Sequence, residues 1–246
     1  MLGGTMLGAI RHKGFIPWDD DIDIGMPRKD YERFYELISS NSSQIINYAI
    51  ETPNSTSSDY FYPLTKLYDK RTTLIENTKY KIKRGIYLDI FPLDGIGQSY
   101  QESLKNFKKI YWKHNLLLTR VVGIRKNRSI FKNAAAIILQ TLPNAIINNK
   151  KLLISLDNLC KVKDFDECEW VGNLIGAWRT KEIMPRNVFG TPTLYKFEDF
   201  NFYGAERSDE YLTYLYGDWR RLPPTEKQIS HHDFIEINLH KSYLDY

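Results

Sequence analysis

The stretch Trp18–Gly25 reads Trp-Asp-Asp-Asp-Ile-Asp-Ile-Gly and decides the fold class of this chain. Aspartate alternates with isoleucine from Asp21 to Ile24, which is the two-residue period of a β-strand, and we expect a strand over 21–26. In such a strand Ile22 and Ile24 enter the core, whereas Asp21 and Asp23 project together from the opposite face. Because two carboxylates on one face repel each other unless a cation lies between them, the stretch predicts a metal site.

The residue types limit which metal and which class of protein this stretch fits. Ligands that are all oxygen favour Mg²⁺ or Mn²⁺ over zinc. A calcium loop that starts at Asp19 requires glycine and glutamate where the chain has Ile24 and Asp30, so that class is excluded. The residues before Asp21 are not the apolar strand that a phosphoaspartate hydrolase needs. A solvated acidic turn and the Asp-x-Asp motif of a nucleotide-sugar glycosyltransferase both stay open from this stretch alone.

A glycine turn lies upstream of the acidic stretch. The residues Gly3, Gly4 and Thr5 open an expected helix over 4–12, and the N–H groups at a helix N-terminus bind phosphate. The predicted strand starts 17 residues after Gly4. A glycine turn, a helix and an acidic strand in this order bring phosphate donors and a metal site together. This arrangement resembles the nucleotidyltransferase superfamily.

The resemblance implies a third carboxylate from a later strand. Asp89 is the candidate, because the flanking sequence Tyr87-Leu88-Asp89-Ile90-Phe91 is that of a buried strand, expected over 85–92. The set Asp21, Asp23 and Asp89 is then the predicted catalytic and metal-binding group. For Asp89 alone, a turn residue at a strand end is the alternative.

The resemblance extends to one family. The segment 4–24 is similar to the first motif of the LicD family of phosphocholine transferases, which also resembles fukutin and the fukutin-related protein. Later motifs of that family are matched at Leu88–Asp94, Tyr216–Trp219, Leu222–Pro224 and the pair His231-His232. The resemblance implies an enzyme that transfers a substituted phosphate, such as phosphocholine, from a CDP-linked donor such as CDP-choline. It implies a hydroxyl of a cell-surface glycan or glycolipid as acceptor, in teichoic acid, lipopolysaccharide or capsule.

Several polar residues outside the acidic stretch are further candidates. A guanidinium suits phosphate oxygens, so we assign Arg11 to the donor phosphates, with a solvated surface arginine as the alternative. Lys66 either neutralises phosphate or caps a surface strand expected over 61–68. His231 and His232 are candidates to orient the acceptor or to act as a base. Because adjacent residues of a strand face opposite ways, we expect at most one of these two histidines to serve.

Composition limits the partners and the compartment. The 246 residues are 42% hydrophobic and 26% charged, with a net charge of +4, which is too weak a positive charge for a duplex-binding protein, and we expect no nucleic acid partner. Two cysteines, Cys160 and Cys168, cannot form a disulfide framework, and we find no signal peptide, so we expect a cytoplasmic protein. Basic residues on both sides of the apolar segment 134–142 leave two readings open. One is peripheral contact with the inner face of the plasma membrane, and the other is a packed helical cap.

The expected architecture is an α/β fold, with a nucleotidyltransferase-like mixed sheet and a helical C-terminal extension. We expect a catalytic core over 1–100 and a helical insertion and cap over 101–246, which completes the site. Members of the family carry a helix and a strand before the glycine turn, so we expect this core to lack them. A glycosyltransferase, or a truncated nucleotide-binding remnant without catalysis, is the alternative to a phosphocholine transferase.

Overall fold

The computed structural model describes residues 1–40, 46–57, 59–78, 81–121, 130–143, 145–230, 232 and 234–245. The chain forms two compact units, each assembled from separated parts of the sequence. The first unit contains Met1–Asn41, Leu88–Phe107 and Cys160–His232. The second unit contains Ser42–Tyr87, Lys108–Leu159 and Asp233–Tyr246. The functional division at about residue 100 stays a prediction.

The sheet of the first unit brings two of the predicted acidic residues side by side. Strand β1 (Asp23–Pro27) pairs in parallel with β6 (Tyr87–Gly97), and Asp23 lies opposite Asp89 in the register. The last part of β6 pairs antiparallel with β7 (Trp170–Gly172), which pairs with β8 (Ile183–Pro185). The pairings of β6 with β1 and with β7 therefore join segments that are more than 60 residues apart in sequence.

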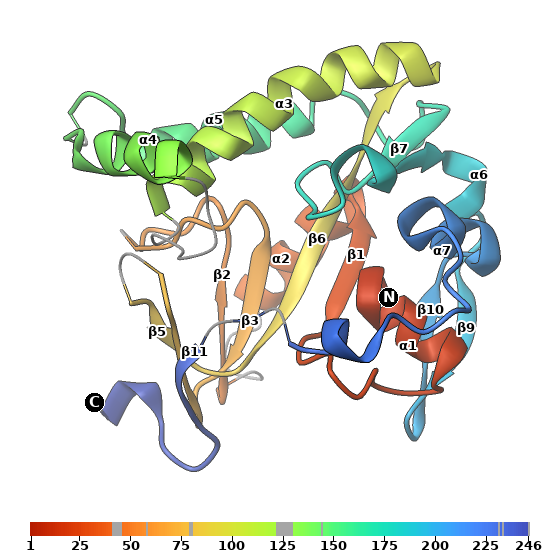
Figure 1. The fold of residues 1–246 in the computed structure, drawn as a ribbon, viewed down its shortest axis with the longest axis horizontal. Helices are drawn as coiled ribbons and strands as arrows, with labels where there is room; N and C mark the ends of the chain where they lie inside the picture. Colours follow the sequence, from red (N-terminus) through yellow and green to blue (C-terminus); the bar gives the residue numbers. More distant parts are fainter. Residues whose placement is uncertain are drawn as a thin grey trace. The chain divides into compact units, whose positions relative to one another are not determined.

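Helix α1 (Gly3–Arg11) packs against β1, against β9 (Thr193–Phe197) and against α7 (Ser208–Tyr216), as Figure 1 shows. Strand β9 forms a hairpin with β10 (Phe200–Gly204), and α6 (Arg186–Phe189) packs on α7. The apolar side of α1 enters a core shared with these elements. Its fully or almost fully buried members include Met6, Val171, Met184, Val188, Leu212 and Leu215.

A buried ion pair joins the helix that follows β1 to the sheet. Helix α2 (Arg28–Ser40) starts at Arg28, whose Nε and Nη2 atoms each donate a hydrogen bond of 2.8 Å to the Asp94 carboxylate on β6. Both residues are buried. The two parallel bonds fix the start of α2 directly after the acidic strand.

The second unit contains two small groups of strands and most of the helical segment. Strand β2 (Tyr48–Glu51) pairs with β3 (Thr65–Asp69), and β4 (Thr73–Glu76) lies between β5 (Lys83–Arg84) and β11 (Phe234–Asn238). The helices are the continuation of α3 (Tyr100–Val121) beyond residue 107, α4 (Ile130–Thr141) and α5 (Asn149–Cys160). Short 3₁₀ turns occur at Arg179–Glu182 and Thr225–Lys227 in the first unit and at Tyr243–Asp245 in the second.

The mixed α/β class is confirmed, with the bounds of three strands corrected. The strand expected over 85–92 runs from Tyr87 to Gly97. The acidic strand starts at Asp23 rather than at residue 21, because the chain turns before it, where the Asp19 N–H donates to the Ile16 carbonyl oxygen. The strand expected over 61–68 starts only at Thr65, after Pro63, which has no N–H to donate to a ladder. Among the described residues, no helix combines the length and the apolar composition needed to cross a membrane.

Candidate active site

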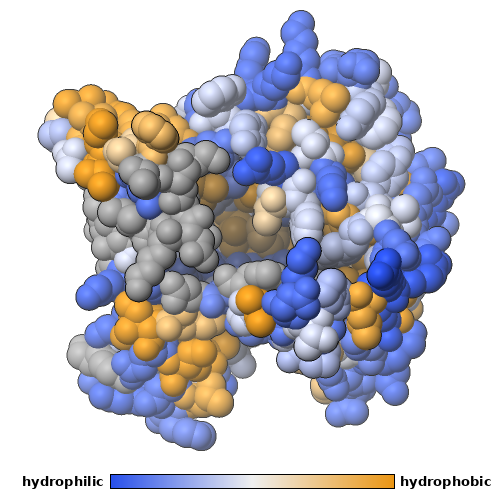
Figure 2. Space-filling view, viewed as in Figure 1, coloured by the Kyte–Doolittle hydropathy of each residue, from blue (hydrophilic) through white to orange (hydrophobic). Residues whose placement is uncertain are grey.

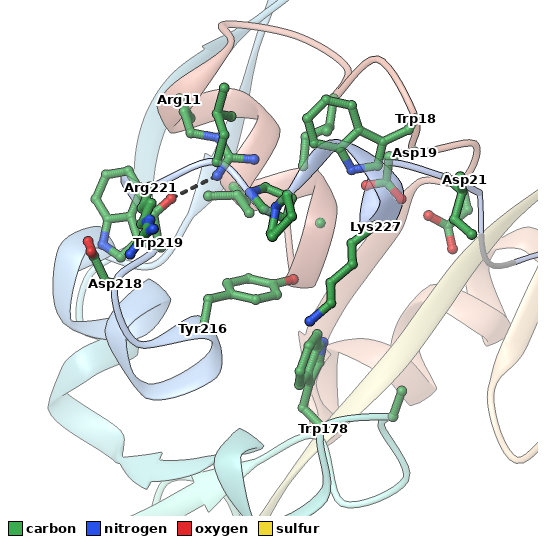
Figure 3. Close-up of a pocket in the computed structure, with 18 of the residues that line it drawn as sticks. Arg11, Trp18, Asp19, Asp21, Trp178, Tyr216, Asp218, Trp219, Arg221 and Lys227 are labelled. Carbon is green, nitrogen blue, oxygen red and sulfur yellow. Dashed lines mark hydrogen bonds between the residues drawn. The ribbon is translucent and has the colours of Figure 1, made fainter.

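A pocket of about 1280 Å³ opens in the first unit, and the acidic stretch forms one of its walls. Figure 3 shows the side chains that project into it from α1, from the acidic stretch, from the turn at Trp178 and from the segment after α7. The lining includes Gly4, Arg11, Trp18, Asp19, Asp21, Asp23, Trp178, Tyr216, Trp219, Arg221, Lys227 and His232. Residues 4–23 and 177–232 thus meet in one cavity.

Three aspartates of the acidic stretch line the pocket, and Asp20, which is not part of the lining, forms a tight group with two of them. Asp19, Asp20 and Asp21 each offer a carboxylate oxygen, and these oxygens lie within 4.8 Å of one another. Burial and the charges of Asp21 and Asp89 raise the pKa of Asp23 to about 8. The predicted set Asp21, Asp23 and Asp89 is therefore electrostatically coupled, and Asp19 and Asp20 join it.

The acidic group fits a hard divalent cation. Its ligand atoms are all carboxylate oxygens, which Mg²⁺ and Mn²⁺ prefer. Burial, together with the charges of Asp21 and Asp20, also raises the pKa of Asp19 to about 6. A raised carboxyl pKa means that the negative charges are unfavourable as they stand, and a bound cation would offset that cost.

The N-terminus of α1 lies directly against these carboxylates. A Cβ atom on Gly4 would come within 2.2 Å of Asp19 Oδ2, so any other residue here would displace that carboxylate from its position. Gly3 has a φ of +48°, a left-handed conformation that favours glycine, and its N–H donates to the Tyr211 hydroxyl at 3.0 Å. The Thr5 hydroxyl accepts a hydrogen bond of 2.9 Å from the Asp23 N–H. Of the three predicted phosphate-binding residues, Gly4 lines the pocket, while Gly3 and Thr5 make contacts that hold the turn in place.

His232, which comes from the C-terminal segment, lies against two of these aspartates. Its Nδ1 atom lies 2.6 Å from Asp20 Oδ1, and its Nε2 atom lies 3.5 Å from Asp21 Oδ2. Although burial raises the pKa of Asp20, the hydrogen bonds from Ser230 and His232 outweigh it and lower that pKa. The structure thus brings one of the two predicted histidines to the carboxylates. His231 lies outside the described residues.

Arg11 lines the pocket from the last turn of α1, as the phosphate assignment requires. Its Nη1 atom donates to the Trp219 carbonyl oxygen at 2.8 Å, the dashed line in Figure 3, and its Nε atom donates to His12 Nε2 at 3.0 Å. These bonds hold the guanidinium against the segment after α7. Arg221 and Lys227 add two further cations to the lining.

Lys66 belongs to the second unit, where it is 2% exposed. Its Nζ atom lies 3.2 Å from the ring centroid of Tyr87 and 3.9 Å from Glu76 Oε1. Lys66 is therefore a buried cation with aromatic and acidic partners in its own unit, rather than the cap of a surface strand. Its assignment to the donor stays a prediction.

An aromatic wall faces the acidic residues across the pocket. Trp178 and Tyr216 meet edge to face, with ring centroids 5.0 Å apart. Glu182 supports this corner, because its Oε1 atom accepts a hydrogen bond of 2.8 Å from the Trp178 N–H. Burial raises the pKa of Glu182 to about 7 and places the pKa of Tyr216 above its usual range. Figure 3 shows Lys227 extended toward Trp178 and the Tyr216 hydroxyl directed into the cavity.

The sequence reasoning missed most of this wall. Tyr216 and Trp219 lie in a motif that carried the family resemblance, but no pattern assigned them to the pocket. Trp178 lies in a turn-rich segment without periodicity, and neither it nor Lys227 carried a signal. Asp19 and Asp20 could have been found, because they adjoin Asp21 in the quoted stretch.

The chain is similar to known proteins over the part of the sequence that contains the acidic residues. Residues 1–118 match the family model described as LicD/FKTN/FKRP, nucleotidyltransferase domain. The chain is 32% identical over 239 residues to the lipopolysaccharide cholinephosphotransferase LicD of Haemophilus influenzae, a match that covers 94% of this chain and 84% of that protein. Uncharacterized proteins of Rickettsia typhi and Rickettsia prowazekii are 51% and 49% identical, but over 35 residues only, 11% and 13% of their lengths. No solved structure matches.

These matches confirm the resemblance stated from the motifs, and with it the predicted enzyme class, a transferase for substituted phosphate groups. The alignment with the Haemophilus influenzae protein covers most of both chains, so it is not confined to the acidic stretch. The chain belongs to the LicD family.

Proposed function

We propose that this chain transfers phosphocholine from CDP-choline to a hydroxyl group of a lipopolysaccharide glycan. Its relative in Haemophilus influenzae is named a lipopolysaccharide cholinephosphotransferase. The structural observation that carries the proposal is that one pocket is lined by carboxylates, cations and paired aromatic rings. A donor with a diphosphate at its centre and a quaternary ammonium at one end needs those three kinds of contact.

The diphosphate is assigned to the side of the pocket between α1 and the acidic residues. Arg11, Arg221 and Lys227 line this cavity and provide positive charge for phosphate oxygens. Asp19, Asp21 and Asp23, which line the pocket, and Asp89, beside Asp23 in the sheet, are the residues that would hold Mg²⁺. When bound, Mg²⁺ supplies charge neutralisation for the diphosphate and for the departing CMP. Without it, the same carboxylates would repel the donor.

The choline group is assigned to the corner formed by Trp178 and Tyr216. A quaternary ammonium binds the faces of aromatic rings by cation–π attraction and has no N–H to donate. The two rings meet nearly at right angles, at 80°, so they offer two surfaces to one cationic group. Lys227 extends toward the same corner, so its ammonium has to turn toward the phosphates when choline enters.

The reaction is an in-line displacement at phosphorus. The acceptor oxygen forms a bond to the phosphorus atom that carries choline, and the bond from that phosphorus to the CMP oxygen breaks. CMP leaves with the electron pair. The proton of the acceptor hydroxyl passes to the pair formed by Asp21 and His232, whose Nε2 atom faces the Asp21 carboxylate at 3.5 Å. Positioning and charge neutralisation supply most of the rate enhancement.

The proposal is tested by offering the purified chain a panel of donors with lipopolysaccharide that lacks phosphocholine. We expect CMP release from CDP-choline that requires Mg²⁺ or Mn²⁺ and the acceptor, and no consumption of UDP-glucose. Asp21→Asn should abolish release, whereas Asp199→Asn, at an exposed turn of the β9–β10 hairpin, should retain it.

The other outcomes select the alternatives. Consumption of UDP-glucose in place of CDP-choline would support a glycosyltransferase. Bound but intact donors throughout the panel would support a nucleotide-binding protein without catalysis. Calorimetry with each donor distinguishes binding without turnover from the absence of binding.

A further inference from the structure

The helical segment of the second unit is basic in sequence, and the proposed chemistry does not use it. Residues 108–159 hold ten lysines and arginines and a single acidic side chain, Asp157. The rest of the chain holds 24 lysines and arginines against 29 aspartates and glutamates. The positive excess of the whole chain is therefore confined to this segment.

The orientation of α4 within this segment is fixed by polar contacts on its inner side. Arg120 on α3 is 2% exposed and donates hydrogen bonds to the carbonyl oxygens of Leu139 and Leu142, at the C-terminal end of α4. The Gln140 side chain donates to the Thr119 carbonyl oxygen at 2.9 Å. Ala136 is fully buried on the same helix. These contacts decide which face of α4 is turned toward α3 and which is left outside.

The outer face of α4 is apolar. Phe131 is 87% exposed and Ile138 is 64% exposed, and Ala134 and Ala135 between them are exposed as well. Positions 131, 134, 135 and 138 follow the i, i+3, i+4, i+7 spacing, so they form one stripe along the helix. Figure 2 shows apolar side chains gathered over α4. A face of this kind, held outward by a buried arginine, needs a partner.

Helix α3 adds cations and an aromatic ring to the same unit. Trp112 is 72% exposed, and Lys108 and Lys109, which are also exposed, precede it by one turn of the helix. Tryptophan is enriched at the boundary between water and lipid, and lysine is attracted to anionic headgroups. Basic side chains and a tryptophan on α3, together with an outward apolar stripe on α4 of the same unit, have the composition of a membrane-interface surface.

We infer that α3 and α4 dock this chain on the surface of a bilayer that contains anionic lipids. The charge of the segment favours this occupant, because the described acidic side chains of the protein lie almost entirely outside it. The exposed aromatic patch on β9–β10 makes the contrast clear. Phe200 and Leu194 are 68% and 56% exposed there, but the acidic residues Glu198 and Asp199 are close to them in the hairpin. With 12 residues, α4 is too short to cross the bilayer and lies along it. Docking would hold the enzyme where an acceptor with a lipid anchor is presented.

The test is co-sedimentation of the full chain with vesicles. The probes are vesicles of phosphatidylethanolamine and phosphatidylglycerol (anionic) and vesicles of phosphatidylcholine alone (neutral). We expect at least tenfold tighter binding to the anionic vesicles, weakened by added salt. The double variants Phe131→Ser with Ile138→Ser, and Lys108→Glu with Lys109→Glu, should each reduce this binding at least fivefold.

Matched controls change the same residue types elsewhere. Leu194→Ser with Phe200→Ser removes apolar side chains of similar exposure, and Arg33→Glu with Lys196→Glu makes the same change in charge on the first unit. Both control proteins should bind anionic vesicles as the wild-type chain does. In addition, lipids with brominated chains should quench the emission of Trp112, and the loss of that quenching in Trp112→Phe identifies the residue that enters the interface.

Three results would overturn the inference. Equal binding to neutral and anionic vesicles would remove the charge argument. Wild-type binding by the α4 double variant would show that the stripe does not contact lipid. A dimer in solution that the α4 variant converts to a monomer, without any vesicle binding, would show that a second copy of the chain covers the stripe. The measurement needs no turnover, so it does not depend on the proposed reaction.

Discussion

Replacing Asp23 with asparagine should stabilise the metal-free protein and abolish the reaction at the same time. Asparagine has the shape of the aspartate side chain but carries no charge at any pH. The backbone bond from the Asp23 N–H to Thr5 is unaffected by the change, so the junction between α1 and β1 should persist. The substitution therefore isolates the charge of one carboxylate in the acidic group.

The size of the effect follows from the raised pKa of Asp23. Burial and the neighbouring carboxylates move this pKa from 3.8 to about 8, so the folded state favours the protonated form. The stability that this provides is fully present below about pH 3.8 and is lost as pH rises through about 8. At pH 8 the full shift corresponds to at most roughly 5 kcal/mol, and solvent in the open pocket reduces it to about 2–4 kcal/mol. Asp23→Asn should be more stable than wild type by this amount at pH 8 and by little at pH 4.

Urea unfolding at pH 4, 6 and 8, with and without Mg²⁺, measures the effect. Mg²⁺ should stabilise the wild-type protein at pH 8 and stabilise Asp23→Asn much less, because the variant has lost one of the charges that the cation offsets. Asp199→Asn, at an exposed turn, is the matched control and should change neither stability nor transfer. If Asp23→Asn is less stable than wild type at pH 8 without Mg²⁺, or if it retains transfer, the account of the acidic group is wrong.

Three further substitutions test separate contacts. Arg11→Ala should weaken the binding of CDP-choline by about 1.5–3 kcal/mol in calorimetry, which is the scale of hydrogen bonds to a charged group. Unchanged affinity would show that Arg11 does not bind the donor and only holds the segment at Trp219 in place. Trp178→Ala should weaken CDP-choline by about 1–2 kcal/mol but leave CDP-glycerol, which has no cationic group, within twofold, whereas an equal loss for both donors would contradict the choline assignment. Arg28→Ala should lower the free energy of unfolding by about 3–5 kcal/mol, because it removes two hydrogen bonds and the opposite charge from the buried Asp94 carboxylate. A loss under 1 kcal/mol in urea unfolding would refute that interpretation.

The local part of the fold could be predicted from the sequence. The alternation of aspartate and isoleucine marked the acidic strand, and the helix expected over 4–12 agrees with α1 to within one residue at each end. The strand that pairs with the acidic strand was also predicted. Asp89 was the candidate for the third carboxylate, and it lies opposite Asp23 in the parallel register. The prediction succeeded because the acidic strand alternates strictly and because β6 is an apolar run that is buried over most of its length. The catalytic role of the pair stays a prediction.

The rest depended on contacts that no local pattern reports. The short strands β7 to β10 have three to five residues each, too few for a period to show, and they lie in an aromatic segment rich in turns. The pairing of Trp178 with Tyr216 joins residues 38 positions apart, one directly before a 3₁₀ turn and the other at the end of a helix. The buried position of Lys66, between two tyrosines and a glutamate, likewise arises from tertiary packing. Such contacts follow from the fold as a whole.

The central claim is that the phosphate next to choline passes to the acceptor and that CMP leaves. It is tested most directly with CDP-choline that carries one isotope in the choline methyl groups and another in the cytosine ring. Mass spectrometry then follows both labels after incubation with the chain, Mg²⁺ and lipopolysaccharide that lacks phosphocholine. We expect the choline label on the glycan and the cytosine label only in free CMP. A cytosine label on the glycan, with free phosphocholine in solution, would show nucleotidyl transfer and would contradict the account.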